Sequence, residues 1–482
     1  MDAISRLFKP KRESIFSLLI ISIFAFLHFQ FIRTSMVNVF ILDDWDYFLA
    51  IKDRMGGSGF YFEKVFFPFA EFITTVPAWC IYFLGEVFQY DTRVFLLMSY
   101  ILNVMGLLLI LGNRPIDRIA SSQFKDFLCR LVTLLLVSAL WFTPATYGSS
   151  MRACELITYV MLFFTLLSIK LFVELNLPGS HFRSQYKLVF LIFCAVAASM
   201  SGVQGYFALL LGLYLAIGRF GSVRLTALIV SVFGVLIWAT LRLRFVHAQG
   251  DPMYAVLHPG KMIMFFLNYL GSGIYRPIYS IEYFGIELAL LGLVLFLIYL
   301  LILFDGWRTR KLENYHLLIL FTLFVALATT IGRSSFPIWV SGSAHYMPCK
   351  IVGLVGAVCW AMGKLGNYSG ISYLRQGGAV FVLLLASTHL YTFYGVRNRI
   401  MLTERERRFS ILDGLFDYEK LSDQKFRNFI HPNRTVFEGN ASRMARLGMG
   451  VFSNRFHLPK DYRSKGEKSL SEMQDYWKNR VR

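Results

Sequence analysis

The sequence predicts an all-α polytopic membrane protein whose chain crosses a bilayer about eleven times. Hydrophobic residues make up 56% of the 482 residues and charged residues only 16%, well below the roughly 25% charged residues of a soluble domain. Apolar runs of the roughly 17–25 residues that cross a bilayer's hydrocarbon recur along most of the chain. Aromatic residues reach 17%, a share typical of lipid-facing surfaces and interfacial belts.

The distribution of positive charge predicts the orientation of these spans. Lys and Arg gather at the N-terminus and in alternate connections, which the positive-inside rule assigns to the cytoplasm. The net charge of +19 is therefore explained by inner loops rather than by nucleic-acid binding, and an odd number of spans places the C-terminus outside. We expect the spans at 14–33, 94–112, 127–143, 154–174, 188–203, 205–218, 225–241, 284–304, 315–331, 346–363 and 377–395.

The segment 34–92 is expected to form the first outer loop, because it carries eight acidic and three basic residues. Within it, the stretch 66–84 is apolar enough to span, but Glu71 and Pro77 weaken it as a spanning helix. A span here would also move the basic loop after residue 112 to the outside. We interpret this stretch as an interfacial helix on the membrane surface.

Two further hydrophilic segments are expected outside the bilayer. The loop 242–283 contains an amphipathic piece near Lys261–Leu270. The tail 396–482 has 19 Lys and Arg against 11 Asp and Glu and reads as a small periplasmic domain or an ordered extension. We therefore divide the chain into a transmembrane domain over 1–395 and this tail.

An acidic cluster follows the first span in the run Leu42-Asp43-Asp44-Trp45-Asp46-Tyr47. Three carboxylates so close together repel one another unless a cation, a proton or a partner is near. They could act as a general base, hold sugar hydroxyls or bind a divalent metal. The flanking Trp45 and Tyr47 could stack on a sugar ring. The plainer interpretation is a solvated acidic loop with interfacial aromatic residues.

Charged and polar side chains at other outer edges complete the candidate site. Arg333 directly follows an apolar run and could hold a lipid phosphate, or could simply snorkel to the interface. His345, at the opening of the tenth span, could donate to a phosphate or shuttle a proton. Arg152 and Glu155 could be an i,i+3 pair. The candidate substrate-binding residues are Asp46, Trp45, Tyr47, Glu71, Arg152, Glu155, Arg276, Arg333, His345 and Tyr346.

The chain lacks the sequence motifs of several common enzyme chemistries. The sequence contains no Walker A, no GxGxxG after a strand and no HExxH. The six cysteines lack the CxxC spacing of metal sites and mostly lie in or beside apolar runs. Nucleotide-driven chemistry is therefore not indicated, and a divalent metal at the acidic cluster is the one cofactor that the residues suggest.

With these residues in place, the chain resembles the GT-C class of integral-membrane glycosyltransferases, and within it the bacterial enzymes that glucosylate O-antigen and change serotype. The resemblance rests on the overall layout and on Asp43-Asp44-Trp45, Phe67-Pro68-Phe69, Gly332-Arg333 and Ala344-His345-Tyr346. It implies a GT-C-like fold in the bacterial inner membrane, with Asp44 or Asp43 as the catalytic carboxylate.

The resemblance also implies the partners of the reaction. The donor would be a polyprenyl-phosphate-linked sugar, and the acceptor O-antigen or another polysaccharide or lipid-linked glycan at the periplasmic face. A flippase and a donor-synthesising enzyme would belong to the same pathway. Membrane lipids are the remaining partner, and nucleic acid is not expected.

Two other functions stay open at this point. A lipid-linked oligosaccharide flippase or other transporter would place charged residues within spans, often at broken helices in two matched halves. An O-antigen polymerase or ligase would not need an early aspartate pair. A polymerase or ligase would change the length of the polysaccharide, whereas a branching glycosyltransferase would add a side branch, so an assay of the polysaccharide would distinguish them.

Overall fold

The structure is a computed structural model, and in the residues that it describes the chain is helical apart from two strands of two residues each. The described residues are 12–34, 36–41, 44–57, 62–69, 72–112, 124–176, 184–218, 221, 223–247, 251–275, 285–309, 312–366, 373–418, 433–459, 462 and 469–480.

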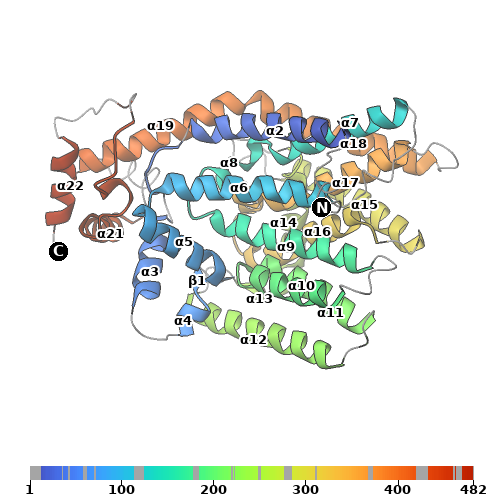
Figure 1. The fold of residues 1–482 in the computed structure, drawn as a ribbon, viewed down its shortest axis with the longest axis horizontal. Helices are drawn as coiled ribbons and strands as arrows, with labels where there is room; N and C mark the ends of the chain where they lie inside the picture. Colours follow the sequence, from blue (N-terminus) through green and yellow to red (C-terminus); the bar gives the residue numbers. More distant parts are fainter. Residues whose placement is uncertain are drawn as a thin grey trace, which may run out of the picture.

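Each of the predicted spans falls on a helix, and these helices run side by side in a bundle (Figure 1). Their bounds are α2 (Arg12–Arg33), α6 (Thr92–Leu111), α7 (Phe124–Trp141), α9 (Leu156–Asn176), α10 (Ser184–Ser199), α11 (Tyr206–Gly218), α12 (Val223–His247), α15 (Ile286–Thr309), α16 (Asn314–Arg333), α17 (Met347–Gly366) and α18 (Tyr373–Gly395).

Among the described residues, eight helices are long and apolar enough to cross a membrane. The other three predicted spans, α2, α10 and α11, are shorter apolar helices over their described residues. The chain therefore has the helices of a polytopic membrane protein, while the count of eleven crossings stays a prediction.

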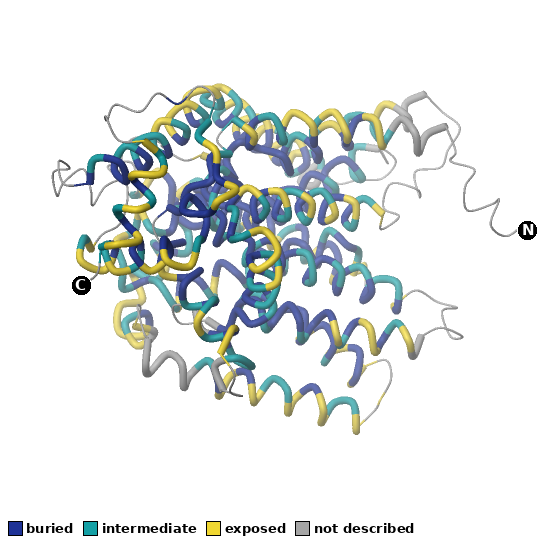
Figure 2. Tube along the Cα trace, turned by 60° about the vertical axis from the view of Figure 1, so that its left-hand side comes forward, coloured by how far each residue is buried: buried dark blue, intermediate teal, exposed yellow. Residues whose placement is uncertain are grey.

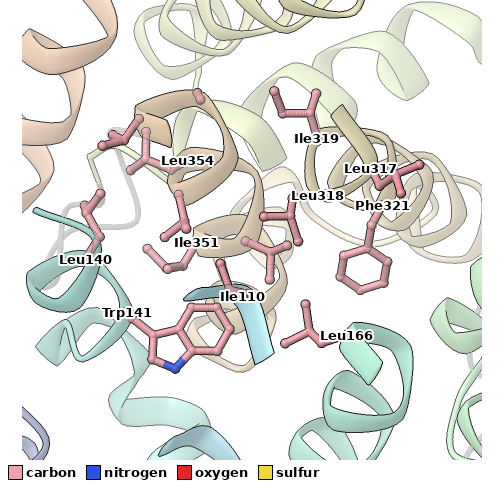
Figure 3. Packing of buried hydrophobic residues seen from close by; sticks show 14 of the residues in the cluster. Ile110, Leu140, Trp141, Leu166, Leu317, Leu318, Ile319, Phe321, Ile351 and Leu354 are labelled. Carbon is pink, nitrogen blue, oxygen red and sulfur yellow. The ribbon is translucent and has the colours of Figure 1, made fainter. Parts of the chain in front are cut away.

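Helix α17 lies at the centre of the bundle, and 83% of its apolar window is buried inside the protein. Ile351 and Leu354 of α17 pack with Leu318 of α16, Trp141 of α7 and Leu166 of α9 (Figure 3). By contrast, only 17% of the window in α12 is buried. This helix lies at the edge of the bundle with many apolar side chains exposed (Figure 2), as expected for a helix that faces lipid.

The first loop differs from its prediction at the proposed surface helix. Instead of a helix from 66 to 84, β1 (Pro68–Phe69) pairs antiparallel with β2 (Phe72–Ile73), and α5 (Thr75–Phe88) begins afterwards. The side chain of Thr75 explains the late start, because its Oγ1 accepts from Phe67 N at 2.9 Å and donates to Val65 O at 2.7 Å. These bonds satisfy the irregular backbone that precedes the helix.

Helix α5 has 14 residues, which gives a length of about 21 Å at 1.5 Å per residue. That is less than the roughly 30 Å of a bilayer's hydrocarbon core, as are the lengths of the predicted spans α10 and α11, with 16 and 13 residues. The loop also contains α3 (Asp44–Gly56) and α4 (Phe62–Val65).

The amphipathic piece near 261–270 is helical. It belongs to α14 (Pro259–Gly271), which follows α13 (Pro252–Leu257) and packs closely on α15. A Cβ added to Gly271 would lie 2.0 Å from Leu288 O, and one added to Gly292 would lie 1.8 Å from Leu267 O. Glycines let the two backbones touch, so the apolar face of α14 packs against helices instead of facing a lipid surface.

The tail contains α19 (Arg397–Phe416), α21 (Arg434–Leu447), a 3-10 turn η7 (Gly450–Phe452) and α22 (Leu470–Asn479). α21 and α22 gather with α3 and α5 at one end of the bundle, here called the tail end, on the left of Figure 1. Gly450 N donates to Gln89 O at 2.8 Å, and a Cβ on Gly450 would lie 2.4 Å from the ring of Phe40. The tail and the first loop therefore share one hydrophobic core.

Candidate functional site

Three segments that are far apart in the sequence meet at the tail end of the bundle. They are the start of α3, the short helix α8 (Tyr147–Ser150) with the loop 151–155 that follows it, and the 3-10 turn η5 (Ala344–Tyr346). Asp44 Oδ1 accepts from Cys154 N at 2.9 Å, and Ser149 Oγ donates to His345 O at 3.0 Å. These bonds bring Asp44, Arg152, Glu155 and His345 into one region.

Glycine is needed where α8 meets η5. A Cβ added to Gly148 would lie 2.4 Å from the Cβ of Ala344, closer than side-chain atoms approach in real structures. Gly148 therefore allows the two turns to pack against each other, which places His345 beside α8, directly before the 151–155 loop in the chain.

Asp44 is buried, with 1% of its surface exposed, and both of its carboxylate oxygens accept backbone N–H groups. Oδ1 bonds Cys154 N, and Oδ2 accepts from Ile41 N at 3.0 Å. Burial raises the pKa of this carboxyl, against the opposing effects of these two N–H groups and of the Arg152 charge. Asp44 thus holds backbone in place, and in this conformation it is closed to a sugar hydroxyl.

Arg408 of α19 is a second buried charge at this site, and the sequence analysis missed it. It is 1% exposed, and its guanidinium donates to Met151 O and, at 3.5 Å, to Val37 O. Burial lowers the pKa of Arg408 to about 10, although Glu404 and Asp44 act against this. The sequence did contain a sign of this burial. Arg408 is three, four and seven residues before the apolar Ile411, Leu412 and Leu415, so it lies on the same buried face of the helix.

The expected stacking of Trp45 and Tyr47 on a sugar is contradicted. Trp45 is fully buried, with its ring centroid 4.8 Å from that of Phe437 and 5.2 Å from that of Phe40. Tyr47 is 2% exposed. The tail covers Trp45, whereas Tyr47 is covered within the first loop, with its ring centroid 5.9 Å from that of Phe67 and its hydroxyl donating to Thr74 Oγ1 at 3.2 Å. Asp46, between Trp45 and Tyr47, is exposed and accepts from Asn440 Nδ2 at 2.6 Å.

A buried lysine of α17 lies next to the η5 turn and was also missed. Lys350 is 3% exposed and donates to Ser272 Oγ and to Ser341 O, both at 2.8 Å. Its Nζ lies 4.4 Å from the ring centroid of Tyr269 and 6.0 Å from that of Tyr346. A lysine inside the apolar run 346–363 was a signal in itself, because a charge within a span is costly without a function or a partner.

Of the other predicted residues, Glu155 belongs to the region already described, and Arg333 lies at the end of a different helix. Glu155, half-buried at the start of α9, accepts from Thr158 Oγ1 at 2.9 Å. Arg333 ends α16, with its guanidinium 5.2 Å from the ring of Phe336. Arg333 is near α14, because Lys261 Nζ donates to Ser335 O at 3.4 Å. The predicted residues Asp43, Glu71 and Arg276 lie outside the described residues.

The described residues contain no group of three or more His, Cys, Asp or Glu side chains arranged to hold a metal ion. Comparison of the chain with protein-family models finds no match. Comparison with curated proteins finds none either.

Proposed function

We propose that this protein is a membrane glycosyltransferase that moves a sugar, in our proposal a glucosyl group, from a polyprenyl-phosphate donor to O-antigen or another surface polysaccharide. The reaction would take place at the periplasmic face of the bacterial inner membrane. One observation carries the proposal: Asp44, Arg152, Glu155 and His345, chosen separately from the sequence, lie in one region at the tail end of the bundle.

In the proposed reaction, an acceptor hydroxyl attacks the anomeric carbon of the donor sugar. The new bond joins the acceptor oxygen to that carbon, the bond to the lipid phosphate breaks, and the hydroxyl proton passes to a carboxylate. We assign this carboxylate to Asp43, because its neighbour Asp44 has both oxygens bonded to backbone. General-base help of this kind contributes roughly 10²- to 10⁴-fold in rate.

Cationic groups would stabilise the lipid phosphate as it leaves. Arg333, with His345 or Arg276, has this role in the proposal, because preorganised cations act strongly where water is excluded. Direct displacement inverts the anomeric centre. Arg152, two residues before the bonded Cys154 in the chain, is the further cation of the site.

The test is an analysis of the lipopolysaccharide of cells with and without the protein. We expect one hexose per repeat unit to appear with the wild type and to be lost with Asp43→Asn, at equal amounts of protein in the membrane. Glu406→Gln is the matched control, because Glu406 is an exposed carboxylate of the tail, and it should leave the glycan unchanged.

The outcomes separate the activity from the residues. An unchanged glycan with the wild type would contradict transfer to this acceptor. A hexose that is still added by Asp43→Asn would keep the activity but remove Asp43 from the role of base; Glu155→Gln would then be the next variant to measure.

A lipid-linked oligosaccharide transporter is the second candidate, favoured by the buried Lys350 within α17. A transporter would move a lipid-linked sugar across vesicles that contain only the purified protein, without forming a new glycosidic bond. Loss of this movement in Lys350→Met, with no hexose added by the wild type, would favour the transporter.

A further inference from the structure

The N–H groups of two irregular loops meet at one buried carboxylate. Asp44 accepts from Ile41 N at 3.0 Å in the loop before α3, and from Cys154 N at 2.9 Å in the loop before α9. The two loops are 110 residues apart at this contact, so the carboxylate ties the first outer loop to the edge of the helix bundle.

The carbonyl groups of the same two loops meet at one buried guanidinium. Arg408 of α19 donates to Val37 O at 3.5 Å and to Met151 O. Each loop is therefore bonded at a carbonyl by the tail and at an N–H by α3. Hydrogen bonds to charged groups are roughly twice as strong as neutral ones, and buried backbone groups left unpaired are costly.

We propose that Asp44 and Arg408 form a charge clamp that holds the 151–155 loop, and with it Arg152, in its working geometry. Arg408 is a positioning residue in this inference, and α19 is part of the site rather than an appendage. The effect of the clamp on catalysis rests on the proposed glycosyl transfer; its effect on the loop does not.

Two buried thiols allow opening of the clamped loop to be measured separately from unfolding of the whole protein. Cys154 lies in the clamped loop and is 4% exposed, and Cys194 lies within α10 in the core of the bundle and is 0% exposed; neither is in a disulfide. A thiol reagent reaches Cys154 when the loop opens, whereas it reaches Cys194 when the bundle itself opens.

The experiment measures the alkylation rates of both thiols by peptide mass spectrometry on the full-length protein in detergent. We expect Cys154 to react on the order of tenfold faster in Arg408→Gln than in the wild type, with the rate of Cys194 unchanged. Arg408→Lys should give an intermediate rate, because a single ammonium replaces the planar fork of donors. Arg405→Gln is the control: it removes a charge from the same helix, where the guanidinium lies 5.5 Å from the Phe409 ring.

Each outcome is decisive for the clamp. Equal Cys154 rates in wild type and Arg408→Gln would overturn it, as would a parallel increase at Cys194, because Arg408 would then support the whole fold. Asp44→Asn should also raise the Cys154 rate, and the double variant should exceed either single variant by little, since both act on one loop.

Measurements of transfer keep the two proposals distinct. In cells where the wild type adds a sugar, Arg408→Gln should lower transfer at unchanged protein level, and Arg408→Lys should restore part of it. A faster Cys154 reaction with no sugar added by the wild type would leave the clamp standing and the glycosyltransferase proposal refuted. Transfer that is lost in Arg408→Gln with an unchanged Cys154 rate would refute the clamp and leave the glycosyltransferase proposal standing.

Discussion

The two ends of the helix bundle hold their buried charges in different ways. At the tail end, Asp44 and Arg408 bond to the backbone of loops. At the opposite end, where α17 finishes, Asp305 of α15 pairs with Lys364 of α17 at 2.6 Å and accepts from Trp360 Nε1 at 3.3 Å. One end uses charge to shape backbone, and the other uses it to join two helices.

The difference follows from what the backbone can satisfy by itself. Within α15 and α17 the N–H and C=O groups bond along the helix, so the charged side chains are left to pair with each other. The loops 37–41 and 151–155 have no such regular pattern, and buried groups in them need side-chain partners. Where charged side chains hold irregular loops in one conformation, the loops can present the other side chains of a binding or catalytic site in a fixed geometry.

Removal of the tail-end carboxylate should have the largest effect on stability. Asp44→Ala leaves two backbone N–H groups without their acceptor and removes the counter-charge of Arg408. We expect a loss of about 3–5 kcal/mol in the free energy of unfolding, the range for breaking a buried charge pair. Unfolding of the purified protein by denaturing detergent would measure it. Asp46→Ala, at an exposed neighbour, should change it by about 0.5 kcal/mol or less; equal losses in the two variants would contradict this account of Asp44.

The pair at the opposite end should contribute less, because the Lys364 side chain is 23% exposed. We expect Asp305→Asn to cost about 1–2 kcal/mol, between the values for surface pairs and buried pairs. The same unfolding assay measures it, with Glu174→Gln as a control at the more exposed Lys187 pair. A cost as large as that of Asp44→Ala would remove the distinction between the two ends.

The smallest effect should be a pH dependence confined to the tail end. Burial raises the pKa of Asp44, so the part of its contribution that depends on protonation is fully present below the unfolded pKa of about 3.9 and is lost as the pH rises through the folded pKa; its bonds to the two backbone N–H groups are a separate contribution. The stability of the wild type should therefore fall relative to Asp44→Asn from pH 4 to pH 7. Thermal unfolding of both proteins across this range checks it, and a constant difference would show that Asp44 does not titrate differently on folding.

Much of the fold could be predicted from the sequence, because long apolar runs and the placement of Lys and Arg carry the signal for membrane helices. Every expected span lies on a helix, from α2 to α18. The prediction failed in the first loop, where β1 pairs with β2 in a stretch that was expected to be helical. The packing of α14 on α15, which Gly271 and Gly292 allow, had not been predicted.

The candidate site was predicted in part. Asp44, Arg152, Glu155 and His345 stood out because charged or titratable residues at the edges of apolar runs are uncommon. Trp45 was misread as a sugar platform, since nothing local shows that Phe437, almost four hundred residues later, covers its ring. Lys350 could also have been predicted, because a charged residue within an expected span indicates a function or a buried partner.

The sequence by itself determined which segments are helices, which of their faces are apolar, and on which side of the bundle the acidic loop is expected. It could do so because the length of an apolar run and the charge of a loop are local properties of the chain. Only the tertiary structure decided that Asp44 is closed by Ile41 and Cys154, and that Arg408 bonds the same two loops. The physical reason is that a buried charge is stabilised by whichever backbone groups the fold brings to it, and those groups are 110 and 257 residues away along the chain.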